Sequence, residues 1–362
     1  MGYFRKNLIT IMLTDKCNLA CPYCYLTKVL KKRNETKSIS LDFAKKGIDD
    51  FFALNEPALR FFAEGEPTAE FDTIVKLWEY ANHKSNGKLY TEIQTNGFFS
   101  PKICDWIKNH IDMTWISCDG STEFQNFYRP TKNQKESSVV VERNIKALAS
   151  SNKRLGIRTS IGFRNIDRQI ELIDYFDSLG VKAIFINRIF KEIDSAEPSK
   201  ETVPALDYAK RFLEAKKYAS KKGIFYSSFW VVNFDEPVEY FCASHLPTPH
   251  LTPLGYVTAC DIVTDITHTN LDKLIYGKYD ELNNRIIYDD ENISYLQNRK
   301  VSNLPKCNSC DIKTFCGGYC LAETINQYGS DLGNNQEICD AIRLLAKELG
   351  TNYTELYPYI HP

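Results

Sequence analysis

The chain has 362 residues, of which 43% are hydrophobic and 25% charged, with 45 lysine and arginine residues against 46 aspartate and glutamate residues. This composition is that of ordinary soluble globular proteins and excludes disordered and fibrous classes. The balanced charge argues against binding to nucleic acid or a membrane surface as the main role. Apolar runs of roughly 18 residues and signal-peptide features are absent from the sequence, so we expect a cytoplasmic protein, with two domains on grounds of length.

Short apolar runs alternate with segments of helical periodicity in the first two-thirds of the chain. We predict strands at Asn7–Leu13, Ala58–Phe62, Lys88–Gln94, Met113–Cys118, Leu155–Gly162 and Lys182–Phe190. We predict helices at Ser40–Leu54, with Ser40 as N-cap, and at Phe71–His83, Pro101–His110, Val139–Ala149, Asp167–Leu179 and Pro204–Lys222. Such alternation predicts an α/β fold with parallel strands and right-handed crossovers, as either an open sheet or a partial barrel.

The pattern changes from about Phe234, where helical periodicity fades and prolines and glycines become frequent. We therefore place a domain boundary near residue 235, between a first domain at 1–235 and a second at 236–362. A region this irregular has little regular core of its own, and metal cross-links are a natural source of stability for it.

Cysteine is the abnormal residue type in this composition. In a reducing cytosol cysteines are not expected to form structural disulfides, and a chain of this length does not need them to stabilise its core. Metal binding is therefore the first candidate role. The twelve cysteines lie at 17, 21, 24, 104, 118, 242, 260, 307, 310, 316, 320 and 339.

Cys17, Cys21 and Cys24 follow the first predicted strand in the segment TDKCNLACPYCY, with the spacing C-x3-C-x2-C. Three thiolates on one short loop can hold three irons of a cubane cluster and leave the fourth iron open to a small molecule. The alternative is a zinc loop, but structural zinc needs a fourth protein ligand, and no histidine or cysteine follows nearby.

This spacing, with an aromatic residue before the last cysteine, resembles the signature of the radical SAM superfamily. The matching residues are Cys17, Cys21, Tyr23 and Cys24. The resemblance implies a partial (β/α)6 barrel and a [4Fe-4S] cluster whose unique iron is chelated by the amino and carboxylate groups of S-adenosylmethionine (SAM). It also implies that the reduced cluster cleaves SAM to methionine and a 5'-deoxyadenosyl radical.

Polar residues that follow the next predicted strands resemble the SAM-binding residues of that superfamily. Glu66 lies in FFAEGEPT, which is similar to the family's Gly-Gly-Glu-Pro segment, although Glu64 replaces the first glycine. Active sites of parallel α/β folds form where strands end. By this resemblance the residues expected to bind SAM are Tyr23, Glu66, Asn96 in QTNG, Ser117 in WISCDG and, for the SAM carboxylate, Arg143, with Arg129 as its competitor.

Seven later cysteines resemble the pattern of the SPASM extension of peptide- and protein-modifying radical SAM enzymes. The pattern begins at Cys242 and continues with Gly255-x4-Cys260. It then has the spacing C-x2-C-x5-C-x3-C, which starts at Cys307 and ends at Cys320, and its last member is Cys339. Zinc-ribbon sites are the alternative, since C-x2-C is common in zinc proteins. The resemblance implies two auxiliary [4Fe-4S] clusters, an inner one held by Cys242, Cys260 and Cys320 and an outer one held by Cys307, Cys310, Cys316 and Cys339, which makes three clusters in all.

The inner set has one ligand fewer than in some relatives. Anaerobic sulfatase-maturing enzymes have an eighth cysteine where this chain reads ASHLPTPH. The open iron would then be bound by water, by His245 or His250, or by a substrate group. Asp261 matches an aspartate that is the proposed base in those relatives, and a turn-capping role is its alternative. Oxidative quenching of a carbon radical needs a proton acceptor near an electron acceptor.

The resemblance implies a radical SAM oxidoreductase that takes hydrogen from a precursor peptide and installs an oxidative modification, such as a carbon–carbon (cyclophane-type) or thioether cross-link. The alternatives are a sulfatase-maturing, formylglycine-generating enzyme and, from another class, an iron–sulfur electron-transfer protein. Expected partners are the precursor peptide or protein and a flavodoxin- or ferredoxin-type electron donor, with no nucleic acid and no membrane. Because the chain begins close to its first predicted strand, we expect leader recognition by the barrel, the SPASM surface or a separate protein.

Overall fold

The computed structural model describes residues 7–32, 35–189, 199–246, 248–266, 268, 270–333 and 335–351. Within these residues the strands form an eleven-stranded sheet in the order β11-β10-β9-β8-β1-β2-β3-β4-β5-β6-β7. Strands β1 to β7 pair in parallel, β8 pairs in parallel with β1, and β9 to β11 continue antiparallel. The strands are β1 (Ile9–Met12), β2 (Ala58–Phe62), β3 (Tyr90–Thr95), β4 (Met113–Ser117), β5 (Arg154–Ile161), β6 (Ala183–Arg188), β7 (Phe225–Ser228), β8 (His250–Leu251), β9 (Tyr256–Thr258), β10 (Ile275–Asp280) and β11 (Arg285–Tyr288).

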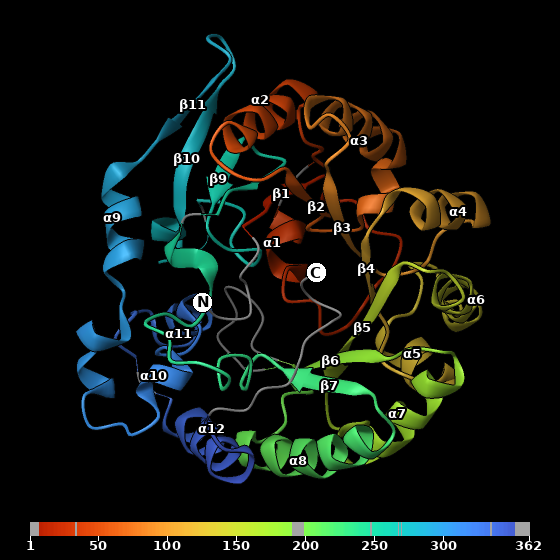
Figure 1. Cartoon of the computed structure of the whole chain (residues 1–362), viewed down its shortest axis with the longest axis vertical. Coiled ribbons are helices and arrows are strands. Elements are labelled where there is room, and N and C mark those ends of the chain that lie inside the picture. Colours follow the sequence, from red (N-terminus) through yellow and green to blue (C-terminus); the bar gives the residue numbers. More distant parts are fainter. Residues whose placement is uncertain are drawn as a thin grey trace.

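The helices lie outside the curved row of strands. Figure 1 shows α2, α3, α4, α6, α7 and α8 arranged around the outer side of β1 to β7. This arrangement is a partial barrel rather than a flat open sheet. The helices are α1 (Thr27–Lys32), α2 (Leu41–Phe52), α3 (Phe71–Lys84), α4 (Pro101–His110), α5 (Thr122–Tyr128), α6 (Ser138–Ala149), α7 (Gln169–Ser178), α8 (Ala205–Lys221), α9 (Asp290–Asn298), α10 (Lys313–Cys316), α11 (Leu321–Tyr328) and α12 (Gln336–Leu349).

The structure confirms the six predicted strands, with ends that differ by no more than one or two residues within the described chain. The predicted end of the sixth, at Phe190, lies outside the described residues. The sequence analysis missed β7, whose four residues FYSS are all buried although two of them are serines. A strand this short and polar gives no apolar alternation by which to find it.

Helix α2 shows how the local sequence produces the barrel wall. The Ser40 side chain accepts a hydrogen bond from the Phe43 amide at 3.5 Å and so caps the helix start, as predicted. Phe43, Ile48 and Phe51 share the buried face of the helix. Burying such side chains stabilises the fold by about 1.5–3 kcal/mol each.

The C-terminal third is joined to the barrel by a strand and a helix. Strand β8 places His250 opposite Thr10 of β1, so the sheet continues past the predicted boundary near residue 235, which stays a prediction. Helix α12 packs against α8. By contrast, none of residues 305–316 is buried. Among the helices that the structure describes, none is long and apolar enough to cross a membrane.

Candidate active site

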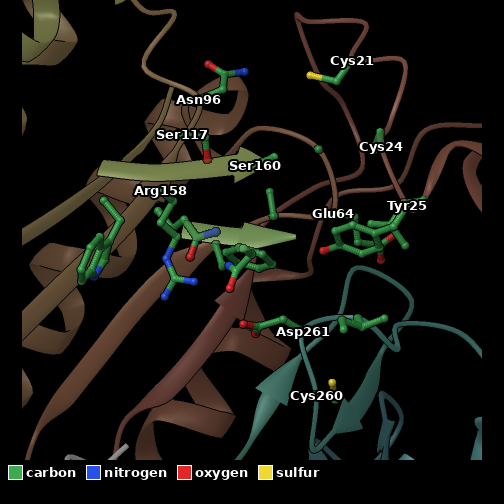
Figure 2. Close-up of a pocket in the computed structure, with 18 of the residues that line it drawn as sticks. Cys21, Cys24, Tyr25, Glu64, Asn96, Ser117, Arg158, Ser160, Cys260 and Asp261 are labelled. Atoms are coloured by element: carbon green, nitrogen blue, oxygen red, sulfur yellow. The ribbon is translucent and has the colours of Figure 1, made fainter. Parts of the chain in front are cut away.

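A cavity of about 850 Å³ lies at the carboxyl ends of the parallel strands. Figure 2 shows Cys21 and Cys24 on one side of it and Cys260 and Asp261 on the other. Its volume is that of a site for a small molecule. The predicted site residues that line it are Cys17, Cys21, Tyr23, Cys24, Glu66, Asn96, Ser117, Cys242, Cys260, Asp261 and Cys320.

The first cysteine loop packs closely against the end of β2. A Cβ atom added to Gly65 would lie 2.0 Å from the Lys16 carbonyl oxygen, and the Glu66 amide donates a hydrogen bond to that oxygen at 2.7 Å. Only glycine therefore fits at position 65. Glu64, which replaces the first glycine of the motif, is buried and lines the cavity instead. The substitution at position 64 thus leaves the approach of Cys17 to Glu66 intact.

The thiols of this loop lie in a poorly solvated site. Burial raises the pKa of Cys17, and it raises the pKa of Cys21 to about 12. Both thiols stay protonated at neutral pH unless positive charge is brought to them, and a coordinated metal supplies that charge. The Asn96 side-chain nitrogen lies 3.9 Å from the Cys17 sulfur as a donor. Within the described residues, no group of three or more histidine, cysteine, aspartate and glutamate side chains is placed to hold one metal ion.

Glu66 is buried and its carboxylate is fixed by four donors. Oε1 accepts hydrogen bonds from the Thr68 amide and hydroxyl, at 3.1 and 2.7 Å, and from the Thr95 hydroxyl at 2.5 Å. Oε2 accepts a bond from the Asn96 amide at 2.7 Å. Burial raises the pKa of Glu66, and these hydrogen bonds oppose that rise. Because each carboxylate oxygen accepts about two hydrogen bonds, Oε2 has capacity for one more donor, such as an amino group.

Tyr23 is tied to a buried ion pair behind the loop. Its hydroxyl donates to Asp119 Oδ2 at 2.5 Å, and Arg129 Nε donates to the same oxygen at 2.9 Å. Asp119 is fully buried, and Arg129 opposes the burial-driven rise in the pKa of Cys21. Tyr23 therefore fixes the loop through its hydroxyl, while its contact with SAM stays a prediction.

The two arginines considered for the SAM carboxylate lie in different places. Arg129 lines the cavity. Arg143 donates to the Phe99 carbonyl at 2.8 Å and to the side chain of Asn144, and it is not among the described side chains that line the cavity. The structure thus brings Arg129 to the cavity and does not bring Arg143 there. Ser117, at the end of β4, does line the cavity as predicted.

The inner three thiols come together at the far side of the cavity. Burial is the main cause that raises the pKa of Cys260, and the neighbouring Cys320 and Cys242 raise it further. The same neighbour effect of Cys242 acts on Cys320, whose pKa burial raises to about 12. Residues from three separate segments therefore lie close enough to influence one another electrostatically, and their role as cluster ligands stays a prediction.

The outer four thiols form a second group. Burial raises the pKa of Cys316 to about 12, and Cys339 and Cys307 add to that rise. The pKa of Cys307 is likewise raised by burial and, more weakly, by Cys310 and Cys339. None of the four is among the described side chains that line the cavity.

Asp261 lies beside Arg60 and His250. Arg60 donates to its Oδ1 at 2.5 Å, and His250 Nδ1 lies 3.0 Å from the same oxygen. Burial alone would raise the pKa of Asp261, but Arg60 and then His250 outweigh that effect and hold the pKa well below its usual range. Asp261 is therefore ionised at neutral pH, as a proton acceptor must be.

His245 is placed differently from His250. Its ring stacks on Tyr240 with 3.6 Å between ring centroids, and its Nδ1 lies 2.7 Å from the Cys242 carbonyl oxygen. Burial lowers the pKa of His245.

The charged residues that line this cavity and that sequence reasoning missed include Arg60, Arg158 and Glu323. Arg158 of β5 lies over the rings of Trp115 and Phe185, at 5.1 and 5.2 Å from their centroids. Alternation along β2 and β5 could have indicated that these arginines face inward with their strand neighbours. No sequence signal indicates which C-terminal residues they meet.

Residues 11–176 match the Radical SAM superfamily. The chain carries a radical SAM domain. An uncharacterized protein of Methanocaldococcus jannaschii is 34% identical over 181 residues, which are 49% of this chain and 61% of that protein. The radical SAM cyclopropyl synthase TigE of Paramaledivibacter caminithermalis is 19% identical over 97% of this chain and 75% of its own length.

A serine-type anaerobic sulfatase-maturating enzyme of Bacteroides thetaiotaomicron is 26% identical over 51% of this chain and 46% of its own length. The chain thus spans less than two thirds of the archaeal and the Bacteroides relative. Among solved structures, native anSMEcpe with bound AdoMet has a TM-score of 0.77 at 17% identity, over 94% of this chain and 96% of that chain. Streptococcus suis SuiB bound to precursor peptide SuiA has a TM-score of 0.68 at 16% identity, over 92% of this chain and 76% of that chain. These structures share the fold, including the C-terminal third.

A radical SAM domain implies SAM and a [4Fe-4S] cluster, and the residues present fit both groups. Cys17, Cys21 and Cys24 supply three thiols from one loop to the cavity. Glu66 Oε2 and Ser117 face the same space with acceptor and donor capacity. The site of the radical SAM domain is therefore the side of the cavity that the first cysteine loop lines.

Proposed function

We propose that this radical SAM enzyme modifies a precursor peptide or protein by removing hydrogen from it and installing an oxidative cross-link. One observation supports this most. A single cavity is lined on one side by the three loop thiols with Glu66 and on the other by the inner thiols with Asp261. A place to generate a radical and a place to remove a proton and an electron thus share one space.

The chain's own residues divide the work at the first side of the cavity. Cys17, Cys21 and Cys24 would hold the [4Fe-4S] cluster, and Tyr23, Glu66, Asn96 and Ser117 would bind SAM, with Arg129 in place of Arg143 because Arg129 lines the cavity and Arg143 does not. With SAM bound, that cluster supplies a 5'-deoxyadenosyl radical that takes one hydrogen atom from a substrate carbon. Glu66 orients the amino group of SAM through Oε2, because its Oε1 already accepts hydrogen bonds from two threonine residues.

The second side of the cavity would complete the oxidation. Cys242, Cys260 and Cys320 would hold an inner auxiliary [4Fe-4S] cluster and Cys307, Cys310, Cys316 and Cys339 an outer one, which supply an electron acceptor there. The substrate loses its second hydrogen as a proton, and Asp261 accepts that proton. Arg60 and His250 fix the position of its carboxylate for that transfer.

The substrate class is supported by the named relatives. TigE, called a cyclopropyl synthase, aligns with nearly the whole chain, and the SuiB structure contains a precursor peptide. The expected product is a carbon–carbon link of cyclophane type or a thioether in a ribosomally made peptide. A flavodoxin- or ferredoxin-type protein would supply the electron that starts each turnover.

The test is anaerobic reconstitution with iron and sulfide, followed by reaction with SAM, dithionite and candidate precursor peptides taken from neighbouring short reading frames. We expect 5'-deoxyadenosine and a peptide lighter by two hydrogen atoms, with fragment ions that locate the cross-link by mass spectrometry. Iron-loaded protein that forms no 5'-deoxyadenosine would instead support the electron-transfer alternative.

Sulfatase maturation is the second candidate. Its support is the match to a sulfatase-maturating enzyme over 191 residues, 51% of this chain. Against it, residues 243–250 contain no cysteine. The same assay with cysteine- and serine-containing sulfatase peptides decides between them, since formylglycine in these peptides would establish the alternative.

A further inference from the structure

The inner set of thiols has only three members, and the remaining cysteines cannot complete it. Cys104 is buried in α4, and Cys118 is buried directly after β4 with its thiol donating to the Gly120 carbonyl. Provided that the inner set holds an auxiliary cluster, as proposed above, one iron needs a ligand other than cysteine. The polar side chains that line the cavity with these thiols include Ser244, His250, Asp261, Tyr319 and Glu323.

Two of these side chains are committed to each other. Asp261 Oδ1 is close to both Arg60 and His250, so binding iron through Asp261 or His250 would disrupt these partly buried contacts. Ser244 contacts the Cys242 sulfur at 3.3 Å, and its hydroxyl is neutral. His245, outside the cavity lining, is stacked on Tyr240.

Glu323 lies in the first turn of α11, directly after the inner-set ligand Cys320. Its negative charge adds to the burial that raises the pKa of the Cys320 thiol, and both residues line the cavity. The carboxylate is thus next to the inner set and faces the same cavity.

Tyr319 holds the Glu323 carboxylate from a strained backbone conformation. Its hydroxyl donates to Glu323 Oε2 at 2.5 Å. Gly317, Gly318 and Tyr319 have φ values of 64°, 83° and 65°, so three successive residues are left-handed. Such a conformation is unfavourable for a bulky aromatic residue and is retained where the surroundings impose it. The turn sends Cys316 to the outer set and Cys320 to the inner set, and it directs the tyrosine hydroxyl to Glu323.

We infer that Glu323 is the fourth protein ligand of the inner cluster, with Tyr319 as the positioning residue for its carboxylate. Carboxylates bind iron in proteins, and this one enters from the same helix turn as the third thiol. The inner cluster would then carry three thiolates and one carboxylate, and the carboxylate would occupy the iron that a substrate group or an added ligand would otherwise reach.

The test uses full-length protein with Cys17→Ala, Cys21→Ala and Cys24→Ala, which leaves only the auxiliary clusters. Iron analysis and Mössbauer spectroscopy first count these clusters, with about eight irons expected. The reduced protein is then titrated with ¹³C-labelled cyanide and followed by EPR and ENDOR. With Glu323 intact we expect no ¹³C coupling at low cyanide. Glu323→Ala should bind cyanide about tenfold more tightly or better, or about 1.4 kcal/mol.

Three further variants make the result specific. Glu323→Cys should restore resistance to cyanide, because a thiolate replaces the carboxylate. Tyr319→Phe should retain its iron but show altered g values, since it only loosens the ligand. Glu201→Gln is the matched control, because Glu201 also accepts a tyrosine hydroxyl, from Tyr128 at 2.7 Å, but does not line the cavity.

Equal cyanide binding with and without Glu323 in protein that holds about eight irons overturns the ligand assignment alone. About four irons or fewer in the starting variant overturn the auxiliary clusters of the proposed function as well. Iron that is retained in Glu323→Ala without any spectral change likewise excludes Glu323 as a ligand.

Discussion

The first cysteine loop and the C-terminal cysteine region bring thiols together by different means. Cys17, Cys21 and Cys24 come from one short loop, which packs on strand ends of a barrel with a continuous apolar core. The later thiols come from segments between Cys242 and Cys339, and the stretch 305–316 contributes no buried residue. We therefore expect the barrel to form its site before any metal binds, and we predict that the outer set depends on a bound metal cluster for local stability.

The largest expected effect separates the two regions by activity. Changing Cys17, Cys21 and Cys24 to alanine should reduce 5'-deoxyadenosine formation to the level without enzyme while about eight of about twelve irons remain. The reason is that only the cluster of this loop is expected to have an iron that can bind SAM. Cys104→Ala is the control, since its buried thiol lies on α4, away from both sets, and iron content and SAM cleavage should not change. Persistent SAM cleavage in the triple variant would place the radical site elsewhere.

The next effect concerns the side of the cavity opposite the loop. Asp261→Asn should retain SAM cleavage but lower formation of modified peptide by about 10²–10⁴-fold, the usual contribution of a general base. Peptide modification and 5'-deoxyadenosine are measured in the same reaction, so their ratio reports the uncoupling. Asp272→Asn, at an exposed position, is the control. Unchanged modification would mean that Asp261 only caps the turn after Cys260.

Local patterns predicted most of the barrel. Short apolar runs located β1 to β6 because their buried residues are close together in sequence. The inner and outer sets were inferred from cysteine spacing by family resemblance and stay a prediction, although thiols of each set influence one another's pKa.

Contacts between distant segments were not predictable in this way. Arg60 meets Asp261 across 201 positions of sequence, and that meeting depends on the pairing of β8 with β1. The choice between Arg129 and Arg143 depends similarly on which helix face turns toward the cavity, which residue type does not reveal. Glu323 gave no sequence signal because a glutamate in the first turn of a helix is ordinary.

A third prediction tests the ion pair behind the first loop. Arg129→Met should lower the free energy of unfolding by about 3–5 kcal/mol, because the fully buried Asp119 loses its partner. Arg143→Met should lower the free energy of unfolding by less than about 1 kcal/mol, because it removes hydrogen bonds at the barrel surface. Denaturant unfolding of the two variants measures the difference, and SAM titration tests both as ligands of the SAM carboxylate. Equal stability of the two variants would show that Asp119 is relieved by other donors.

The smallest expected effect is a difference in hydrogen exchange between the barrel and the C-terminal cysteine region. Removal of iron by a chelator under reducing conditions should speed hydrogen exchange of residues 305–316 by about tenfold or more, while peptides from β2 to β5 keep their protection. The reason is that the outer-set segment has no buried side chains of its own, whereas those strands are buried on the barrel core. Two attachments oppose local unfolding, the pairing of β8 with β1 and the packing of α12 on α8. If barrel and C-terminal peptides lose protection together, these attachments make the chain one cooperative unit, and the metal stabilises both regions equally.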